Sequence, residues 1–107
     1  MKVGYIKETN MMEFHIEKMR ACGVDKVIVD SRNREKIPEL LQTLKNGDEL
    51  HVLAAQHLTR DFYQFANILK QLKEKGVSLY IDGALYHIDR HIDVAEKLSK
   101  QRKEAQE

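Results

Sequence analysis

The chain has 107 residues, enough for one compact domain. Hydrophobic residues make up 42% and charged residues 33%, a balance typical of globular proteins and too apolar for a disordered chain. Eighteen basic and seventeen acidic side chains leave a net charge of +1, which gives no electrostatic argument for a standalone nucleic-acid binder. The single cysteine, Cys22, excludes an intrachain disulfide, and no apolar run is long enough to cross a bilayer. These features favour a cytoplasmic location.

The first half of the chain alternates strand and helix patterns. Residues 2–6 predict a first strand, and residues 11–22 carry apolar side chains at helical spacing. Gly23 then stands where a helix takes a left-handed terminal residue. Residues 26–30 include three consecutive branched aliphatic side chains, which predicts a strand buried on both faces. Residues 37–44 predict a second helix.

The second half continues the same alternation. Residues 49–55 predict a third strand, and residues 77–81 a fourth. Between them, Asp61 and Gln64 form a plausible capping box for a helix that ends at Gly76. Strands joined through helices predict a three-layer α/β fold, with a mainly parallel sheet of four or five strands and helices on both faces.

We assign residues 1–87 to this α/β domain and residues 88–107 to a C-terminal helix. This helix carries a thin apolar stripe formed by Ile88, Ile92, Ala95 and Leu98. Around the stripe lie charged side chains: Lys97, Lys100, Arg102, Lys103, Glu104 and Glu107. Such a stripe is suited to a weak homodimer contact or to another protein partner, or it packs back onto the chain's own sheet.

A set of short landmarks occurs in the order and near the spacing found in one family. The landmarks are Gly4–Tyr5, Gly23–Lys26, Gly47–Asp48, Leu58–Asp61 and Gly76–Ser78. In combination they resemble the catalytic domain of serine recombinases, the resolvase and invertase family, over residues 1 to about 85. The resemblance implies the strand order 2-1-3-4, which right-handed crossovers permit. It also implies a dimer contact through the helix after the core.

The resemblance assigns the family's nucleophile to the end of the first strand. In the family this stretch reads Gly-Tyr-Ala-Arg-Val-Ser, and the serine attacks a DNA phosphodiester to give a 5′-phosphoserine link. Thr9 takes the serine position here and Lys7 the position of the phosphate-binding arginine. Lysine lacks the bidentate fork of arginine, and the threonine methyl group restricts the hydroxyl. Glu8 adds a negative charge beside them.

The second signature departs further from the family pattern Leu-Asp-Arg-Leu-Gly-Arg. Gln56 takes the position of the aspartate and His57 that of the first arginine, and only Arg60 matches. A further phosphate-binding arginine falls on Ile37, and a glutamine of the first helix maps near His15. Phosphoryl transfer depends on dense cationic stabilisation. We therefore expect a pseudoenzyme.

Basic residues near these positions are candidates for binding an anion. Three basic residues follow the second strand: Arg32, Arg34 and Lys36. If they reach the site, they compensate for the arginine whose position falls on Ile37. Otherwise they form a solvated loop. We include His57 with them as a candidate binding residue. Arg60 is either an anion ligand at a helix start or a surface arginine.

Two other residue patterns have both a functional and a purely structural interpretation. Thr9 is either a nucleophile or a loop threonine that caps the first helix. His87 and His91 share a helix face as metal ligands can, but no third ligand stands at a telling distance, so a solvated polar turn is favoured. We predict no metal and no cofactor.

Three functions follow from these features. The first is a non-catalytic recombinase-like module that acts by protein association and regulates or partners DNA recombination or a mobile element. The second is a divergent but active recombinase domain that lacks its DNA-binding part. The third is an unrelated small α/β domain that binds a nucleotide or anion. Any DNA binding by this chain alone is expected to be weak.

Overall fold

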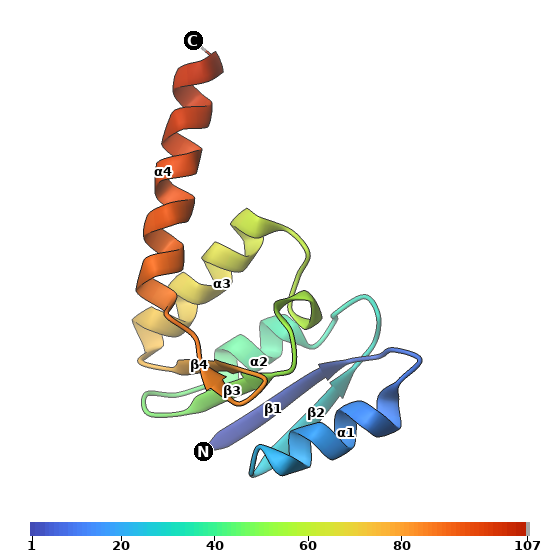
Figure 1. The fold of residues 1–107 in the computed structure, drawn as a ribbon. Coiled ribbons are helices and arrows are strands. Elements are labelled where there is room, and N and C mark those ends of the chain that lie inside the picture. The colour runs from blue at the N-terminus through green and yellow to red at the C-terminus, as the bar shows by residue number, and fades with distance from the viewer. Residues whose placement is uncertain (107) are drawn as a thin grey trace.

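The computed structural model describes the backbone of residues 1–106 and the side chains of residues 1–98. The elements, in chain order, are β1 (Lys2–Lys7), α1 (Met12–Ala21), β2 (Lys26–Asp30), α2 (Ile37–Thr43), β3 (Glu49–Val52), a short 3-10 turn η1 (Ala55–His57), α3 (Phe62–Lys75), β4 (Ser78–Ile81), β5 (Ala84–Leu85) and α4 (Ile88–Gln106). They form one sheet in the order β2-β1-β3-β4-β5 (Figure 1). The first four strands pair in parallel, and β5 pairs antiparallel with β4. The predicted α/β fold and the order 2-1-3-4 are confirmed.

Most of the hydrophobic core lies on one face of the sheet, under α2 and α3. Tyr5, Leu50 and Leu79 point from the strands into this core, and Leu40 and Leu69 meet them from the helices. The opposite face carries only α1, and there Met19 lies against Gly4. A Cβ atom at Gly4 would come within 2.7 Å of the Met19 side chain, so this close approach needs glycine. Large apolar side chains therefore fill the space under α2 and α3, whereas α1 approaches the sheet closely at a glycine.

Two sequence predictions about strands are wrong. Strand β3 ends at Val52 instead of continuing to residue 55, because Ala55 begins the 3-10 turn that leads towards α3. Strand β2 is an edge strand and is not buried on both faces: Val29 is 40% exposed. An apolar run alone does not distinguish a central strand from an edge strand that has one open side.

Helix α3 has the start and end that the sequence predicts, with one difference. The Asp61 carboxylate accepts the backbone N–H of Gln64 at 2.8 Å, and Gly76 ends the helix with a left-handed φ of +72°. The Gln64 side chain does not complete the predicted capping box. Its Oε1 accepts the hydroxyl of Thr59 at 2.9 Å, and Thr59 Oγ1 accepts the N–H of Asp61 at 3.1 Å.

Helix α4 packs its first half against α3 and then extends away from the body (Figure 1). Ile92 and Ala95 are buried in this contact, and Ile88 is partly buried against the core. Much of the predicted apolar stripe is thus covered within the chain, by α3 and not by the sheet, and only Leu98 of the stripe is exposed. The side chains of Lys100, Arg102, Lys103, Glu104 and Glu107 lie outside the described residues.

Within the described part of the chain, no helix has the length and apolar character needed to cross a membrane. The cytoplasmic location stays a prediction.

Candidate functional site

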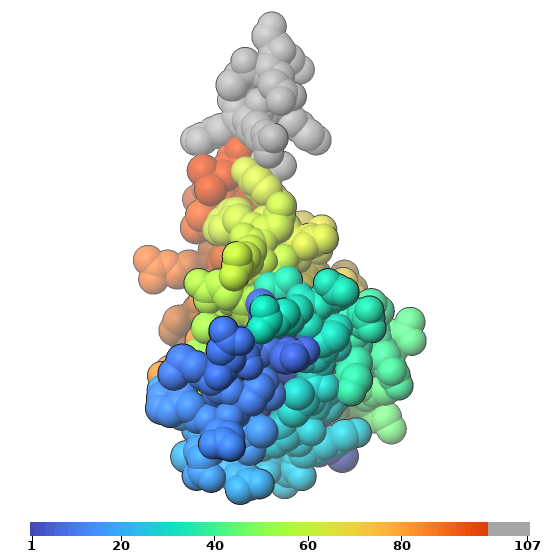
Figure 2. Space-filling model, turned by 90° about the vertical axis from the view of Figure 1, so that its right-hand side faces the viewer, coloured from blue at the N-terminus to red at the C-terminus, as the bar shows by residue number. Residues whose placement is uncertain are grey.

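Three loops meet where the parallel strands β1, β2 and β3 end. The loop after β1 carries Thr9, the loop after β2 carries Arg32 and Arg34, and η1 with the following residues carries His57 and Arg60. Figure 2 shows the blue N-terminal segment beside the teal segment that follows β2, with the yellow-green start of α3 above them. The carboxyl edge of a parallel sheet is the usual place for a functional site. Lys36, by contrast, lies back along β2 and donates from Nζ to the carbonyl of Val29 at 3.0 Å.

Thr9 makes two hydrogen bonds through one hydroxyl group. Its Oγ1 accepts the backbone N–H of Met11 at 3.2 Å and lies 3.0 Å from Nδ1 of His15. The oxygen keeps a second lone pair as well as its proton, so which group donates in the bond to His15 depends on the histidine tautomer. Thr9 is half-buried and closes a turn before α1, whose N-cap position is Met11.

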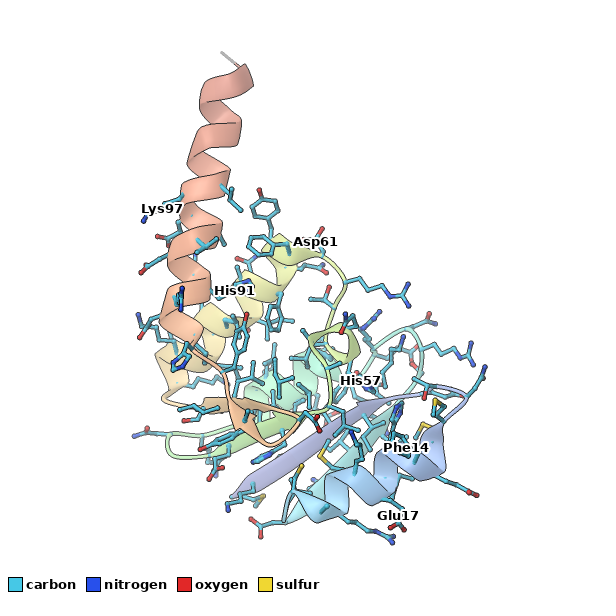
Figure 3. All side chains as sticks on the ribbon, viewed as in Figure 1. Phe14, Glu17, His57, Asp61, His91 and Lys97 are labelled. Atoms are coloured by element: carbon cyan, nitrogen blue, oxygen red, sulfur yellow. The ribbon has the colours of Figure 1, made fainter. Side chains whose placement is uncertain are left out.

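His57 is a buried residue, and its ring holds the loops together. Its Nδ1 accepts the backbone N–H of Lys7 at 3.1 Å, which leaves the proton of the neutral ring on Nε2. Burial lowers the pKa of His57, and the charges of His15, Lys7 and Arg34 lower it further. In Figure 3, His57 lies between η1 and α1, and its ring meets that of His15 edge-on at 5.1 Å between centroids. His57 is therefore an uncharged group at neutral pH.

A group of cations surrounds Lys7. Desolvation and the charges of Arg34, Arg60 and Arg32 lower the pKa of the Lys7 ammonium from its ordinary value. Among the described residues, none of these four side chains forms an ion pair with a carboxylate. Like charges without counter-ions favour the binding of an anion.

The two loop arginines are held in place by protein contacts. Arg34 donates from Nη2 to the carbonyl of Gln56 at 2.8 Å and from Nε to the carbonyl of His57 at 3.3 Å. Its backbone adopts a φ of +58°, which costs a residue with a Cβ about 1–2 kcal/mol. Arg32 donates to Asn10 at 3.0 Å. Arg34 thus joins the loop after β2 to η1, and Arg32 joins it to the loop after β1.

Asp30, which sequence reasoning missed, organises the loop after β2. The buried carboxylate accepts the hydroxyl of Tyr5 at 2.7 Å and the backbone N–H groups of Ser31 and Lys36 at 2.7 and 2.8 Å. Burial and the hydrogen bond to Asp30 raise the pKa of Tyr5 far above its ordinary value. The signal available in the sequence was a carboxylate directly after an apolar strand, where a parallel sheet turns into a loop.

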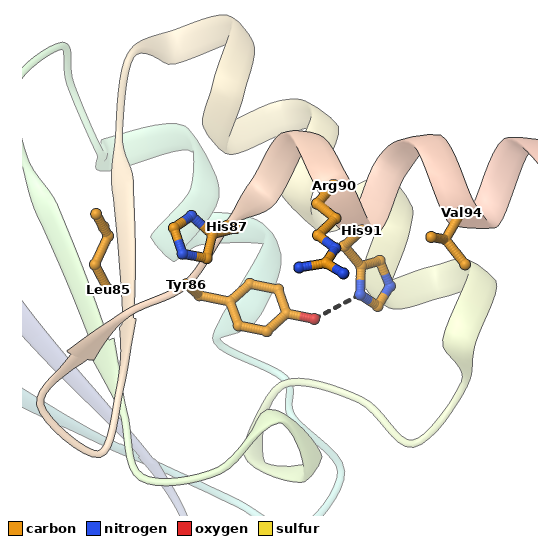
Figure 4. Close-up of a pocket in the computed structure, with 6 residues that line it drawn as sticks. All are labelled: Leu85, Tyr86, His87, Arg90, His91 and Val94. Atoms are coloured by element: carbon orange, nitrogen blue, oxygen red, sulfur yellow. Dashed lines mark hydrogen bonds between the residues drawn. The ribbon is translucent and has the colours of Figure 1, made fainter.

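A separate pocket of about 310 Å³ lies between β5 and α4 (Figure 4). Tyr86 and His91 share a hydrogen bond of 2.6 Å in its wall, while Leu85 and Val94 give it exposed apolar sides. His91 Nε2 is buried without a hydrogen-bond partner, and burial lowers the pKa of the ring. His87 is exposed. Within the described residues, no three side chains of the metal-binding types come together.

A comparison with known protein families identifies the family of this chain. The family model described as "Resolvase, N terminal domain" matches residues 8–101, which is most of the chain. The chain belongs to this resolvase family. No curated protein matches it. Family membership replaces the hypothesis of an unrelated α/β domain.

The structure places the other residues that the resemblance assigns to catalytic positions. Ile37, which the resemblance assigns to an arginine position, is buried in the core. Gln56 is exposed, and its backbone carbonyl is bound by Arg34. Arg60 is exposed and has no hydrogen bond or ion pair among the described residues. The three loops thus bring Thr9, four cations and the buried imidazole of His57 to the same edge of the sheet. The resemblance assigns His57 to the position of a family arginine.

Proposed function

We propose that this resolvase domain is catalytically degenerate and acts by association, as a regulatory or partner module in DNA recombination or in a mobile element. The observation that carries the proposal is His57. A family guanidinium is replaced by an imidazole that is buried, bound to the N–H of Lys7 and kept neutral. Cleavage of a phosphodiester develops charge on the phosphoryl oxygens and on the leaving oxygen. A neutral ring whose Nδ1 is committed to a backbone bond offers at most one uncharged N–H donor, so it stabilises that charge much less than a guanidinium does.

The test is cleavage of supercoiled plasmid DNA that carries sites for a related active recombinase, with that recombinase as the positive control. The parent chain and Thr9→Val are compared by nicking and by covalent protein–DNA adducts on denaturing gels. We expect neither product from either protein. An adduct formed by the parent and abolished by Thr9→Val would overturn the proposal.

The association surface lies around the start of α4. Its exposed apolar side chains are Phe62, Leu85, Val94 and Leu98. Phe62 begins α3, Leu85 belongs to β5, and Val94 and Leu98 lie one helical turn apart on α4. We propose that a second copy of the chain covers this surface. A contact with few aliphatic side chains gives a weak dimer, because each contributes about 1.5–3 kcal/mol before ordering costs.

Sedimentation equilibrium tests the dimer. The parent chain is compared with Val94→Lys and with a control, Gln42→Lys, which places the same charge on the exposed surface of α2. We expect the parent and the control to associate at concentrations of about 100 μM, where a weak interface is populated, and Val94→Lys to remain monomeric. A monomeric parent at that concentration would contradict the dimer.

One observation favours a second function, a divergent and active recombinase. The Thr9 hydroxyl lies 3.0 Å from the Nδ1 of His15, within the distance at which a nucleophile meets its base. The DNA assay described above separates this function from the first.

A further inference from the structure

The two edges of the sheet differ in length. The strand β5 forms one edge and has two residues, Ala84–Leu85, whereas β2 forms the other edge and has five, Lys26–Asp30. An edge strand presents a row of N–H and C=O groups with which another extended chain can pair. A two-residue strand offers few such groups. The edge at which this sheet can accept a further strand is therefore β2.

The hydrogen bonds around β2 indicate which of its backbone groups point outwards. The carbonyl of Asp30 accepts the N–H of Glu8 at 2.9 Å, so Asp30 faces β1. Alternate residues of a strand in a parallel pair face the same neighbour, so Val27 and Val29 direct their N–H and C=O groups to the open side. The side chain of Lys36 agrees with this assignment, because its Nζ donates to the carbonyl of Val29 at 3.0 Å. One outward carbonyl is thus covered by a lysine.

A groove of about 380 Å³ lies along this edge, between β2 and α2. It is lined by Val27, Ile28 and Val29 from the strand and by Leu40 and Thr43 from the helix. Val29 is 40% exposed, and Ile28 is only partly buried. A strand added to β2 would place its side chains alternately over the two faces of the sheet, so that one set enters the groove. The surface therefore fits the apolar side chains of an extended segment.

Lysine ammonium groups lie at both ends of the edge. Lys26 begins β2 and is exposed, and Lys36 reaches the strand at Val29. Among the described residues, neither lysine forms an ion pair. The carboxylate of Asp30 is buried and accepts three hydrogen bonds, so the carboxylate that lines the groove is that of Glu39. Two exposed lysines against one exposed carboxylate favour an acidic occupant.

We propose that the open edge of β2 binds an extended acidic segment of a protein partner by strand addition. Hydrogen bonds to the main chain of Val27 and Val29 supply affinity, and the two lysines select for carboxylates near the ends of the segment. In the free chain, Lys36 covers the Val29 carbonyl and hinders pairing with other edges. On binding, an N–H of the segment takes that carbonyl, and the ammonium pairs with a carboxylate of the segment.

This surface goes beyond the proposed function. It lies at the opposite edge of the sheet from β5 and the exposed apolar side chains of α4. It requires neither a dimer nor the loss of catalysis.

The experiment measures binding of a labelled peptide to the full chain by fluorescence anisotropy. The probe is the peptide Glu-Val-Thr-Val-Thr-Glu with blocked ends, and the control probe has lysine in place of both glutamates. We expect the control probe to bind about fivefold more weakly at about 50 mM salt, where screening is limited. In nuclear magnetic resonance spectra, we expect the acidic probe to protect the amide protons of Val27 and Val29 from exchange. A chain that binds neither probe, or both equally, would overturn the proposal.

The variant Val27→Pro tests strand addition, because it removes an outward N–H. Proline is tolerated at an edge position whose N–H faces solvent. We expect the affinity for the acidic probe to fall about tenfold, while the matched control Val27→Thr, which keeps the N–H, binds as the parent does. Thermal unfolding confirms that each variant is folded. A folded Val27→Pro variant that binds as tightly as the parent would contradict strand addition.

The variant Lys36→Glu tests the charge preference and leaves the backbone unchanged, so it decides the matter even if Val27→Pro does not fold. We expect it to bind the acidic probe about fivefold more weakly. Lys97→Glu makes the same change of charge on α4, away from the groove, and should bind as the parent does. Equal effects of the two charge variants would overturn the proposal.

Two further results separate this surface from the proposed dimer. Val94→Lys, which is expected to prevent dimerisation, should bind the acidic probe as the parent does. Self-association of the parent that Val27→Pro abolishes would show that a second copy of the chain covers the edge, and it would overturn the proposal of an acidic partner.

Discussion

The loop after β1 and the loop after β3 both contain a threonine turn and meet a histidine, yet they are built differently. In the β3 loop, His57 binds Lys7, Asp61 caps α3, and the carbonyls of Gln56 and His57 accept Arg34 from the loop after β2. In the loop after β1, helix α1 begins without a side-chain cap, and the Lys7 ammonium has no carboxylate partner. The β3 loop is therefore expected to contribute more to stability than the β1 loop. Substitutions in the two loops measure this difference.

The largest loss of stability is expected from His57→Ala. The change leaves the N–H of Lys7 without its acceptor in a partly buried bond and removes the buried ring of His57. An unsatisfied donor costs about 1–3 kcal/mol when fully buried, and the loss of the packed ring adds to the smaller cost here. Urea unfolding of the variant measures this loss, and His87→Ala, at an exposed histidine, serves as the control. A His57→Ala variant as stable as the control would show that the β3 loop does not depend on this bond.

Asp61→Ala is expected to cost less, about 1 kcal/mol, within the range of 0.5–2 kcal/mol found for N-cap residues. The carboxylate accepts the N–H of Gln64 at the start of α3, the helix that supplies much of the core. Glu13→Ala, in the first turn of α1, is the comparison because no side-chain cap bond is present there. If both variants unfold at the same temperature, the side-chain cap of α3 adds no stability that the start of α1 lacks.

A pH effect of smaller size follows from the buried histidine. The pKa of His57 in the folded chain is below the ordinary value of 6.5, so the unfolded chain binds the proton more readily. The contribution of His57 to the free energy of unfolding is therefore fully present above about pH 6.5, and it is lost as the pH falls through the folded pKa. Urea midpoints from about pH 7.5 to about pH 5 measure the decline.

The variant His57→Gln tests whether His57 causes that decline. It should unfold with a weaker pH dependence than the parent, because the group that takes up the proton is gone. His91 has a lowered pKa for the same reason, burial, so His91→Gln should remove a second part of the slope. If neither variant changes the slope, the acid sensitivity comes from other groups.

The fold was predictable because its signals are local. Helix α3 follows from the periodic apolar residues between Asp61 and Gly76, and the strand order follows from the resemblance to the family. The open edge of β2 was not predictable, since Val29 looks like a core residue when only its neighbours in sequence are known. The 3-10 turn at Ala55 was missed because the apolar character of β3 continues into it.

The sequence predicts candidate positions for the site and not the contacts between them. The motifs point to Thr9, Lys7 and Arg60, which stay predictions, but the bond between Lys7 and His57 joins residues 50 positions apart. His15 was placed only near a family glutamine, because Thr9 precedes α1 and no helical spacing rule links the two. The backbone φ of Arg34, which turns its guanidinium to η1, leaves no mark in the sequence.

The smallest change in stability is expected from Thr9→Val, and it bears most directly on the comparison of the two loops. The Met11 N–H that loses its acceptor is exposed, so water replaces the hydroxyl, and valine keeps the shape of threonine. We expect a change within about 0.5 kcal/mol by urea unfolding. A small change would show that the loop after β1 does not depend on the Thr9 hydroxyl, in contrast to the dependence of the β3 loop on His57. A loss above about 1.5 kcal/mol would instead make the Thr9 turn a structural element.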